Sequence, residues 1–516
     1  MRMAAVFFGK IRKALAISGD LYYNGTDTFF AEGIHIMKRT ISLALCLLML
    51  LASCGNGTSQ ETTAKVSGET TADTTPTETE EALGLPDGLS FTGSTFTFGV
   101  LDNANARNPI VMEELTGEGL NDAQYNTIHM AEEMLDVTIA EYLIEDGYPA
   151  TTKIRSIVQA GDDIIQVANL YCAAAPVMLS DGYALDYNNI PYIDLERSWW
   201  DQSVNQSLCL GDMRYAAVGD LSITTHDLTF ILLFSKAMVD QNGLESPYDL
   251  VDDGKWTMDK MAEMMEVVTV DANGDGKFTA DDTYGYLGTQ KNVLPSFWIG
   301  AGEITIGLNK EGIPEMSMKD ERFVNVIDKV FAITYDNNAR YLSKEPEDVN
   351  QENISMFQEN KGLFMDCSLF WVTALRDMET DFGIIPYPMY DEDQGSYYAR
   401  VSYIMTPIVP ITNGNLELTG AVLETTNYLA KKYITPAYYD ISLKGKYSRD
   451  EESVAMLDLI FANRVLDLGD TIFCPNVRDG FFSSMYTNNN RDLMSQIEKN
   501  ENKIQTTIDD MIKANS

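Results

Sequence analysis

Hydrophobic residues after about position 85 recur at two spacings, one of two residues and one of three to four. Side chains alternate across a strand and repeat about every 3.6 residues around a helix, so the first spacing predicts strands and the second predicts amphipathic helices. In chain order the pattern predicts strand, helix, strand, helix and buried strand, at residues 94–101, 121–135, 137–144, 153–160 and 164–170. This order predicts an α/β lobe with a largely parallel sheet.

Later helices are marked by residues that stabilise helix ends. Thr257 is a predicted N-cap for a helix over residues 258–268. The sequence Ser-Arg-Asp-Glu at 448–451 predicts a capping box before another apolar helix. Residues 416–432 predict a third helix, and Gly161 is expected to end the helix at 153–160.

Residues 37–54 have a different pattern, with two cations, an apolar run and then Leu-Ala-Ser-Cys. This stretch resembles a bacterial lipoprotein signal and its lipobox, in which small residues precede the cysteine that takes the lipid. The alternative is a membrane-spanning or buried helix, but the run is short for a bilayer. The resemblance implies that residues 37–53 are removed, that Cys54 is lipidated and that the chain is anchored at the extracellular face of the membrane.

The flanks of this signal carry little that predicts folded structure. Residues 1–36 show no clear period, and purine-rich codons for 32–33 would form a ribosome-binding sequence, so we expect translation to start at Met37. Residues 54–84 are the lipidated cysteine followed by a tract rich in Thr, Glu, Ser and Gly, which predicts a disordered linker. The remaining chain is long enough for two lobes.

Composition narrows the possible partners. The 77 acidic residues against 37 basic ones give a formal charge of -40, which argues against nucleic acid or an anionic lipid surface as a partner. Four cysteines follow Cys54, widely spaced and without a CxxC pattern, at Cys172, Cys209, Cys367 and Cys474. Free buried thiols are the favoured prediction, and disulfide pairings stay open.

Signals of catalysis are sparse. The sequence contains no GxSxG, HExxH, GxGxxG or Walker A motif. The predicted mature chain has two histidines, His129 and His226, so histidine-based acid–base chemistry is poorly supplied. Carboxylates are abundant, and a pair of glycosidase type therefore remains an open alternative.

One acidic segment, residues 271–282, matches the calcium loop of EF-hands. Its twelfth residue is Asp and not Glu, as in dockerin calcium loops. The predicted ligands are the side chains of Asp271, Asn273, Asp275 and Asp282 and the carbonyl of Lys277. A structural Ca²⁺ is the prediction, and a solvated turn is the alternative, since Asn-Gly and Asp-Gly are common turn formers.

Several short segments spread over the chain carry a family resemblance. They include Tyr192-Ile193-Asp194-Leu195, Trp199-Trp200-Asp201, Gly219-Asp220-Leu221-Ser222, Leu233-Phe234-Ser235-Lys236, Phe382-Gly383-Ile384-Ile385-Pro386 and Lys444-Gly445-Lys446-Tyr447. Their order resembles family 1 of the extracellular solute-binding proteins of ABC transporters, the group that includes maltose-binding protein.

This resemblance implies an α/β, two-lobed periplasmic-binding-protein-like (type II) fold with hinge-connected lobes. Lobe 1 would hold residues 85–225 and lobe 2 residues 226–400, and 401–516 would return to lobe 1 with C-terminal helices packing on both lobes. The implied function is to capture a small solute, an oligosaccharide, and deliver it to an ABC permease as a non-catalytic monomer. The alternative is a surface lipoprotein that acts on glycans as a glycosidase or adhesion module.

A sugar site needs aromatic faces for C–H surfaces and polar groups for hydroxyls, near the ends of strands. The candidates for ligand contacts are Asp102, Asn103, Tyr171, Thr225, Trp298, Asp366, Trp371 and Tyr403. Trp199, Trp200 and Trp256 are predicted to belong to the framework.

Overall fold

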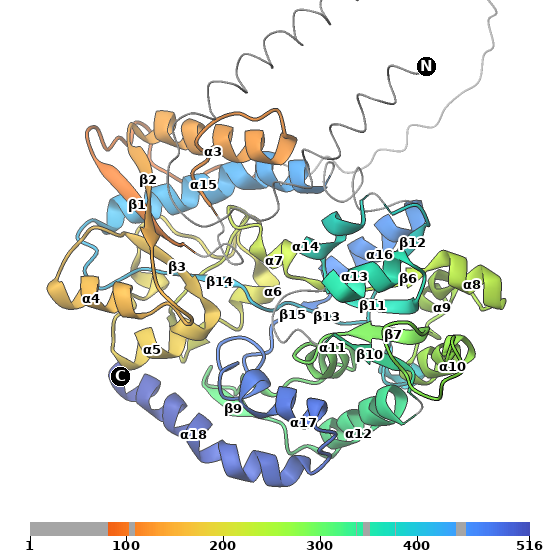
Figure 1. Ribbon diagram of the computed structural model, residues 1–516. Coiled ribbons are helices and arrows are strands. Elements are labelled where there is room, and N and C mark those ends of the chain that lie inside the picture. The colour runs from red at the N-terminus through yellow and green to blue at the C-terminus, as the bar shows by residue number, and fades with distance from the viewer. Residues whose placement is uncertain (1–80, 103–108, 337, 344–350, 377, 440–449) are drawn as a thin grey trace, which may run out of the picture. The chain divides into compact units, whose positions relative to one another are not determined.

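In lobe 1, a four-stranded sheet in the order β14-β3-β1-β2 is built from two distant parts of the chain. The computed structural model describes residues 81–516 except 103–108, 337, 344–350, 377 and 440–449 (Figure 1). Its strands are β1 (Thr95–Leu101), β2 (Thr138–Ile144), β3 (Val167–Tyr171) and β14 (Met405–Ile408). β1 pairs in parallel with β2 and β3, and β14 pairs antiparallel with β3. The predicted parallel arrangement is therefore confirmed.

Helices α3 (Gly119–Leu135) and α15 (Leu416–Ala437) pack against each other over this sheet (Figure 1). Phe96, Phe98 and Val100 of β1 are buried in the same hydrophobic cluster as residues of both helices. Helices α4 (Thr152–Ala160) and α5 (Ala175–Ser180) complete lobe 1. As predicted, Gly161 ends α4, with a left-handed φ of 76°.

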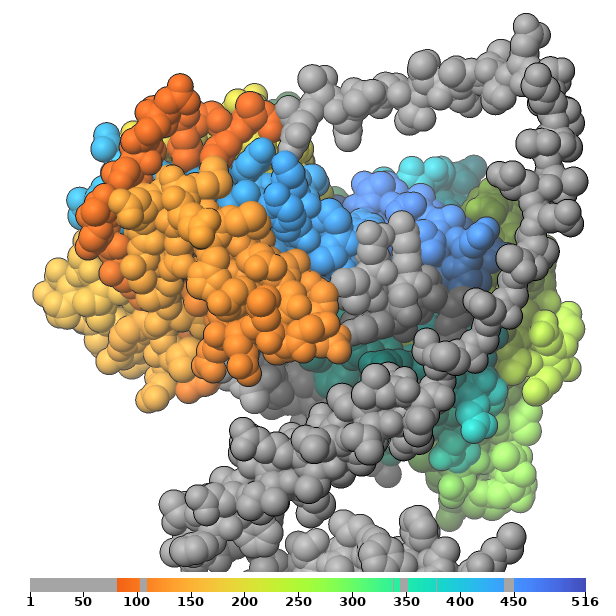
Figure 2. Space-filling model, turned by 90° about the horizontal axis from the view of Figure 1, so that it is seen from above, coloured from red at the N-terminus to blue at the C-terminus, as the bar shows by residue number. Residues whose placement is uncertain are grey.

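Lobe 2 contains a five-stranded sheet in the order β10-β7-β11-β6-β12. The strands are β6 (Phe230–Ser235), β7 (Tyr284–Gly288), β10 (Arg340–Leu342), β11 (Gly362–Ser368) and β12 (Phe382–Ile385). Its helices are α8 (Lys236–Asn242), α9 (Pro247–Asp252), α10 (Met258–Val268), α11 (Val293–Gly300), α12 (Glu321–Tyr335), α13 (Gln351–Gln358), α14 (Leu369–Val372) and α16 (Glu451–Ala462). Figure 2 shows lobe 1, in orange with α15 in light blue, and lobe 2, in green and teal, from above.

Short elements lie outside the two larger sheets. They are α6 (Gln202–Asn205), α7 (Thr224–Asp227), β4 (Cys209–Leu210), β5 (Met213–Arg214), β8 (Ile306–Leu308), β9 (Pro314–Met316), β13 (Ala399–Arg400) and β15 (Arg464–Val465). The chain enters the lobe 2 sheet at β6 and returns to the lobe 1 sheet at β14. Arg464 and Asp201 form an ion pair of 2.8 Å near the crossing.

The chain ends with α17 (Ser483–Thr487) and α18 (Leu493–Ala514). Glu501 of α18 forms an ion pair with Lys319, between β9 and α12. At the other end, the Asn515 amide donates to the carbonyl of Leu179 in α5 over 2.7 Å. Figure 1 shows α18 ending beside α5, so this helix contacts elements of both lobes.

Two helix starts test the capping predictions. The hydroxyl of Thr257 accepts from the Lys260 N–H, which confirms the N-cap of α10. At α16 the N-cap is Asp450, whose carboxylate accepts from the Ser453 N–H over 2.7 Å, and Ser448 lies outside the described residues. The predicted capping box is therefore wrong, because the helix begins two residues later. α15 extends five residues beyond the predicted end, to Ala437.

Several predictions concern residues that the structure does not describe. The signal, Cys54, the linker up to residue 80 and Asn103 are among them. Of the described residues, no helix is both long and apolar enough to cross a membrane. The four described cysteines are all free and buried, as predicted.

Candidate ligand-binding site

Tyr171 and Tyr403, both predicted as ligand contacts, lie close together where β3 and β14 pair. Tyr171 is the last residue of β3 and lies opposite Met405 in β14, two residues after Tyr403. Tyr403 has a φ of 57°, which is uncommon for a bulky residue and costs backbone energy. Both side chains are half-buried. The antiparallel pairing thus brings two aromatic rings to the carboxyl end of β3.

The neighbouring strands of lobe 1 contribute to the same edge. Asp102 directly follows β1 and is exposed. Tyr148 follows β2, is 53% exposed and packs edge-on against Tyr171, with ring centroids 5.6 Å apart. Parallel strands present their carboxyl ends at one edge of a sheet, where ligands bind in open α/β folds. Asp102, Tyr148 and Tyr171 therefore belong to one surface.

Arg478 meets this surface from the C-terminal part of the chain. Its guanidinium lies 4.1 Å from the centroid of the Tyr403 ring and donates to the Ser402 hydroxyl over 3.0 Å. It also donates to both carboxylate oxygens of Asp479, over 3.0 and 3.1 Å. Burial would raise the pKa of Asp479, but the adjacent Arg478 outweighs this and holds that pKa below its usual range. A cation and an anion thus flank the Tyr403 ring.

A buried ionic network holds Arg478 in place. Arg400 is fully buried and forms two hydrogen bonds to the Asp470 carboxylate, of 2.7 and 2.8 Å. The same carboxylate accepts from Arg478 over 3.3 Å. Arg400 also donates to Asn292 of lobe 2, which accepts from the Tyr403 hydroxyl over 3.2 Å. Because each buried cation is paired, the network fixes Tyr403 and Arg478 relative to lobe 2.

Trp298, predicted as a stacking platform for the ligand, lies in the core of lobe 2. Its side chain is completely buried in α11, between the rings of Phe323 and Phe482. The indole N–H donates to Asp467 over 2.8 Å. In this structure Trp298 has no exposed face for a sugar, so the expectation that it stacks on ligand is wrong. The apolar helix around it hides the ring inside lobe 2.

Three other candidates make contacts of their own. Thr225 is buried in α7, and its carbonyl accepts from the Thr229 hydroxyl. Asp366 is buried in β11 and accepts from the Tyr387 hydroxyl, and burial raises its pKa to about 6. Trp371 is half-buried in α14 and packs edge-on against Phe370. For Thr225 and Asp366, burial contradicts the predicted ligand contact.

The predicted framework tryptophans are confirmed. Trp199, Trp200 and Trp256 are at most 2% exposed. The indole N–H groups of Trp199 and Trp200 both donate to the Glu424 carboxylate of α15, each over 3.1 Å.

Sequence reasoning missed Tyr148, Arg478 and Asp479. Tyr148 follows a predicted strand, so the rule that selected Asp102 and Tyr171 would have found it. Arg478 carries no local signal, because its contacts with Ser402 and Tyr403 span a long stretch of sequence. Asp479 was missed with it, because its hydrogen-bond partner is Arg478.

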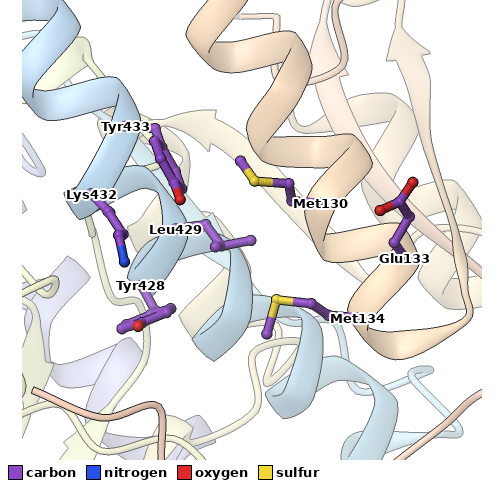
Figure 3. A pocket seen from close by; sticks show the side chains of 7 residues that line it. All are labelled: Met130, Glu133, Met134, Tyr428, Leu429, Lys432 and Tyr433. Atoms are coloured by element: carbon purple, nitrogen blue, oxygen red, sulfur yellow. The ribbon is translucent and has the colours of Figure 1, made fainter.

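A cavity of about 440 Å³ lies elsewhere in lobe 1, between α3 and α15 (Figure 3). It is lined by Met130, Glu133, Met134, Tyr428, Leu429, Lys432 and Tyr433. All seven lie on helices and none at a strand end. This cavity is therefore distinct from the surface formed by Tyr148, Tyr171 and Tyr403.

In the acidic loop, the carboxylates bind backbone donors. Asp271 accepts from the N–H groups of Gly274 and Gly276, over 2.8 and 2.7 Å. Asp282 accepts from those of Ala272 and Thr279, over 3.0 and 2.7 Å. The described residues contain no group of three or more His, Cys, Asp or Glu side chains placed to hold a metal ion. Calcium binding by this loop stays a prediction.

Neither a protein-family model nor a curated protein matches the chain. Solved structures do. M. tuberculosis UspC has a TM-score of 0.53 at 13% identity, over 81% of this chain and 100% of that one. A cyclo/maltodextrin-binding protein complexed with maltotetraose has a TM-score of 0.55 at 10% identity, over 80% and 97%. The cyclic alpha-maltosyl-1,6-maltose binding protein of Arthrobacter globiformis has a TM-score of 0.53 at 12% identity, over 82% and 98%. The likeness confirms the predicted two-lobed α/β fold.

Proposed function

We propose that the chain is a lipid-anchored extracellular receptor that binds an oligosaccharide between its lobes and delivers it to an ABC permease. The observation that carries this proposal is the meeting of Tyr148 and Tyr171 of lobe 1 with Tyr403 and Arg478. It is supported by the fold, which the chain shares with a maltodextrin-binding protein and a cyclic maltosyl-maltose binding protein. These relatives are binding proteins, which does not favour the alternative of an enzyme acting on glycans.

The side chains suit a sugar chemically. Aromatic faces pack on the C–H faces of pyranose rings, and the exposed Tyr148 offers the largest open ring. Asp102 and Asp479 accept hydrogen bonds from hydroxyl groups. The buried Arg478 guanidinium donates to Asp479 and holds that carboxylate in place. A ligand that contacts both lobes only in the closed form shifts the population toward closure.

The test is calorimetry with a panel of α-glucans, β-glucans and short peptides. Tyr171→Ala is expected to weaken binding of a panel ligand roughly tenfold or more, since an aromatic contact contributes about 1 to 3 kcal/mol. Tyr433→Ala is the matched control, because this tyrosine is 38% exposed and lines the remote cavity. Equal losses in the two variants, or binding of no saccharide, would contradict the proposed site.

The anchor is a separate part of the proposal and rests on the Leu-Ala-Ser-Cys sequence at 51–54. Cys54→Ala is expected to abolish labelling by a radioactive fatty acid in cells, because the thiol is the acceptor. Cys46→Ala, which changes a cysteine inside the predicted signal, should leave the label unchanged. Equal label on wild type and Cys54→Ala would exclude lipidation at this residue.

We further propose a structural Ca²⁺ in the loop 271–282, on the sequence match and the donor types at its five ligand positions. A ligand that binds only the folded state raises the melting temperature by mass action. Calcium is therefore expected to raise the melting temperature, and Asp271→Ala with Asp275→Ala should remove this response. Sodium at equal ionic strength is the control, and a wild-type melt that does not respond to chelator would favour the solvated turn.

A further inference from the structure

Two cysteines that are far apart in sequence face each other in the fold. Cys172 and Cys474 are both free, and each is 2% exposed. Their side chains are in hydrogen-bond contact. The Tyr148 hydroxyl lies 3.2 Å from the Cys474 sulfur, beside the proposed ligand surface. The two thiols are therefore close to each other and next to an exposed tyrosine.

The two thiols belong to different lobes. Cys172 directly follows β3 of lobe 1, and its N–H donates to the Ile404 carbonyl over 3.1 Å. Cys474 lies in the segment 466–482, which is held on lobe 2. In that segment Asp467 accepts from Trp298, and the Leu468 N–H donates to the Ile306 carbonyl over 3.2 Å. A bond between the sulfurs would therefore join the lobes.

The surroundings favour reaction at Cys474. The hydrogen bond with Cys172 and the charge of Arg478 hold the pKa of the Cys474 thiol below its usual range, against the effect of burial. The thiolate is the form that attacks a disulfide. The other two cysteines are placed differently, since Cys209 contacts the carbonyls of Gln206 and Gly312 and Cys367 lies within β11.

We propose that Cys172 and Cys474 form a disulfide site that tethers lobe 1 to lobe 2 when the chain meets a small-molecule disulfide. The Cys474 thiolate attacks one sulfur of that disulfide, which forms a mixed disulfide and releases the first small thiolate. Cys172, after losing its proton, attacks the Cys474 sulfur and releases the second small thiolate. Two protein thiols are oxidised and one small disulfide is reduced to two thiols, which take up the two protons.

The tether has a physical consequence for the clamp. It fixes the separation between η1 (Cys172–Ala174) and the segment 466–482, so the lobes lose freedom to move apart. Outside the cell, where the proposed lipid anchor places the chain, conditions favour disulfides. The inference does not depend on which solute binds, because the thiol contact is present without one.

The test starts with the reduced full-length chain in detergent, exposed to oxidised glutathione and digested without reductant. Mass spectrometry is expected to find a peptide pair joined through Cys172 and Cys474. The pair should disappear in Cys172→Ser and Cys474→Ser and persist in the matched control that carries Cys209→Ser with Cys367→Ser. Free thiols, glutathione adducts alone, or another pairing in the folded wild type would overturn the proposal, and that measurement needs no variant.

A second measurement addresses the tether itself. A cross-link that closes a loop of this length restricts the unfolded chain, so oxidation is expected to raise the melting temperature by about 5 °C. Reduction with a thiol should reverse the shift, and the oxidised Cys172→Ser variant should show none. If the cross-linked wild type has the same melting temperature as the reduced protein, the tether is overturned.

Discussion

Trp298 in lobe 2 and Tyr171 in lobe 1 are both aromatic residues of a type that sugar sites use, yet the structure gives them opposite places. Trp298 is fully buried, and its N–H donates to Asp467. Tyr171 ends a strand, is half-buried and packs against the exposed Tyr148. A buried N–H that already donates to a carboxylate belongs to the framework, whereas a ring at an open strand end can meet a ligand.

The same contrast holds within lobe 1. Trp199 and Trp200 donate to the buried carboxylate of Glu424, as Trp298 donates to Asp467 in lobe 2. Burial raises the pKa of Glu424 to about 7 and that of Asp467 to about 6. Tryptophans in both lobes therefore satisfy acids that would otherwise be costly to bury. Framework and ligand surface differ in hydrogen bonding more than in residue type.

The largest expected effect comes from removing the buried tryptophan. Trp298→Ala should lower the free energy of unfolding by about 3 to 5 kcal/mol, because it leaves a cavity and removes a donor from Asp467. Urea denaturation followed by circular dichroism measures the change. Trp298→Phe keeps most of the ring and loses the N–H, so its cost should be smaller. A cost below about 1 kcal/mol for Trp298→Ala would contradict the framework role.

A comparable loss is expected when the central anion of the ionic network is neutralised. Asp470→Asn leaves the buried guanidinium of Arg400 without its carboxylate and weakens the anchor of Arg478. Breaking a buried ion pair in this way costs about 3 to 5 kcal/mol. Asp479→Asn is the matched control. Asp479 is only half-buried, and it pairs with Arg478 but not with Arg400. Equal urea midpoints for the two variants would contradict the central role of Asp470.

Local elements were predictable from sequence because their signals are local. The spacing of apolar residues predicts β1, α3, β2, α4 and β3, and the short polar side chain of Thr257 and the glycine at 161 mark helix ends. The start of α16 was misplaced because Ser448 and Asp450 are both good N-caps, and sequence alone does not choose between them. The choice depends on Asp450 also receiving contacts from Lys236 and Tyr248.

The candidate site was only partly predictable, because burial and long-range contacts decide it. Tyr171 was selected because it follows a predicted strand, and Tyr403 because it lies at the predicted return between the lobes. The β3–β14 pairing brings the two residues close together, and their contact with a ligand stays a prediction. Trp298 was misjudged because a tryptophan on an apolar helix gives the same sequence pattern whether its ring faces a cleft or the core. Arg478 was missed because its partners, Ser402 and Tyr403, are close to it only in the folded chain.

The acid beneath the lobe 1 tryptophans predicts a pH dependence. The pKa of Glu424 rises from 4.5 to about 7 through burial, so the folded chain binds more protons than the unfolded chain between these values. The contribution of Glu424 to the free energy of unfolding is fully present below about pH 4.5 and is lost as pH rises toward 7. The loss is at most about 1.4 kcal/mol per pH unit. The glutamine of Glu424→Gln does not titrate, so the free energy of unfolding of this variant should fall less steeply as pH rises.

Urea midpoints at pH 5 and pH 7.5 measure this difference. Other buried acids, including Asp366 and Asp467, give slopes of the same sign in both proteins, so the wild type minus variant difference isolates Glu424. His226 acts oppositely, because burial lowers its pKa to about 3 and stability then rises with pH. Parallel curves for wild type and Glu424→Gln would show that Glu424 keeps an ordinary pKa.

The smallest expected effect sharpens the ligand side of the comparison. Tyr403→Phe removes the hydroxyl that donates to Asn292 over 3.2 Å but keeps the ring under Arg478. Asn292 still accepts from Arg400 over 3.0 Å, so no buried acceptor is left unpaired and the cost in stability should be at the low end of about 0.5 to 1.5 kcal/mol. Saccharide affinity, which depends on the ring face, should change less than threefold, whereas Tyr403→Ala should weaken it roughly tenfold. Calorimetry on the two variants separates these outcomes, and a Phe variant that binds as poorly as the Ala variant would show that the hydroxyl, and not the ring, carries the contact.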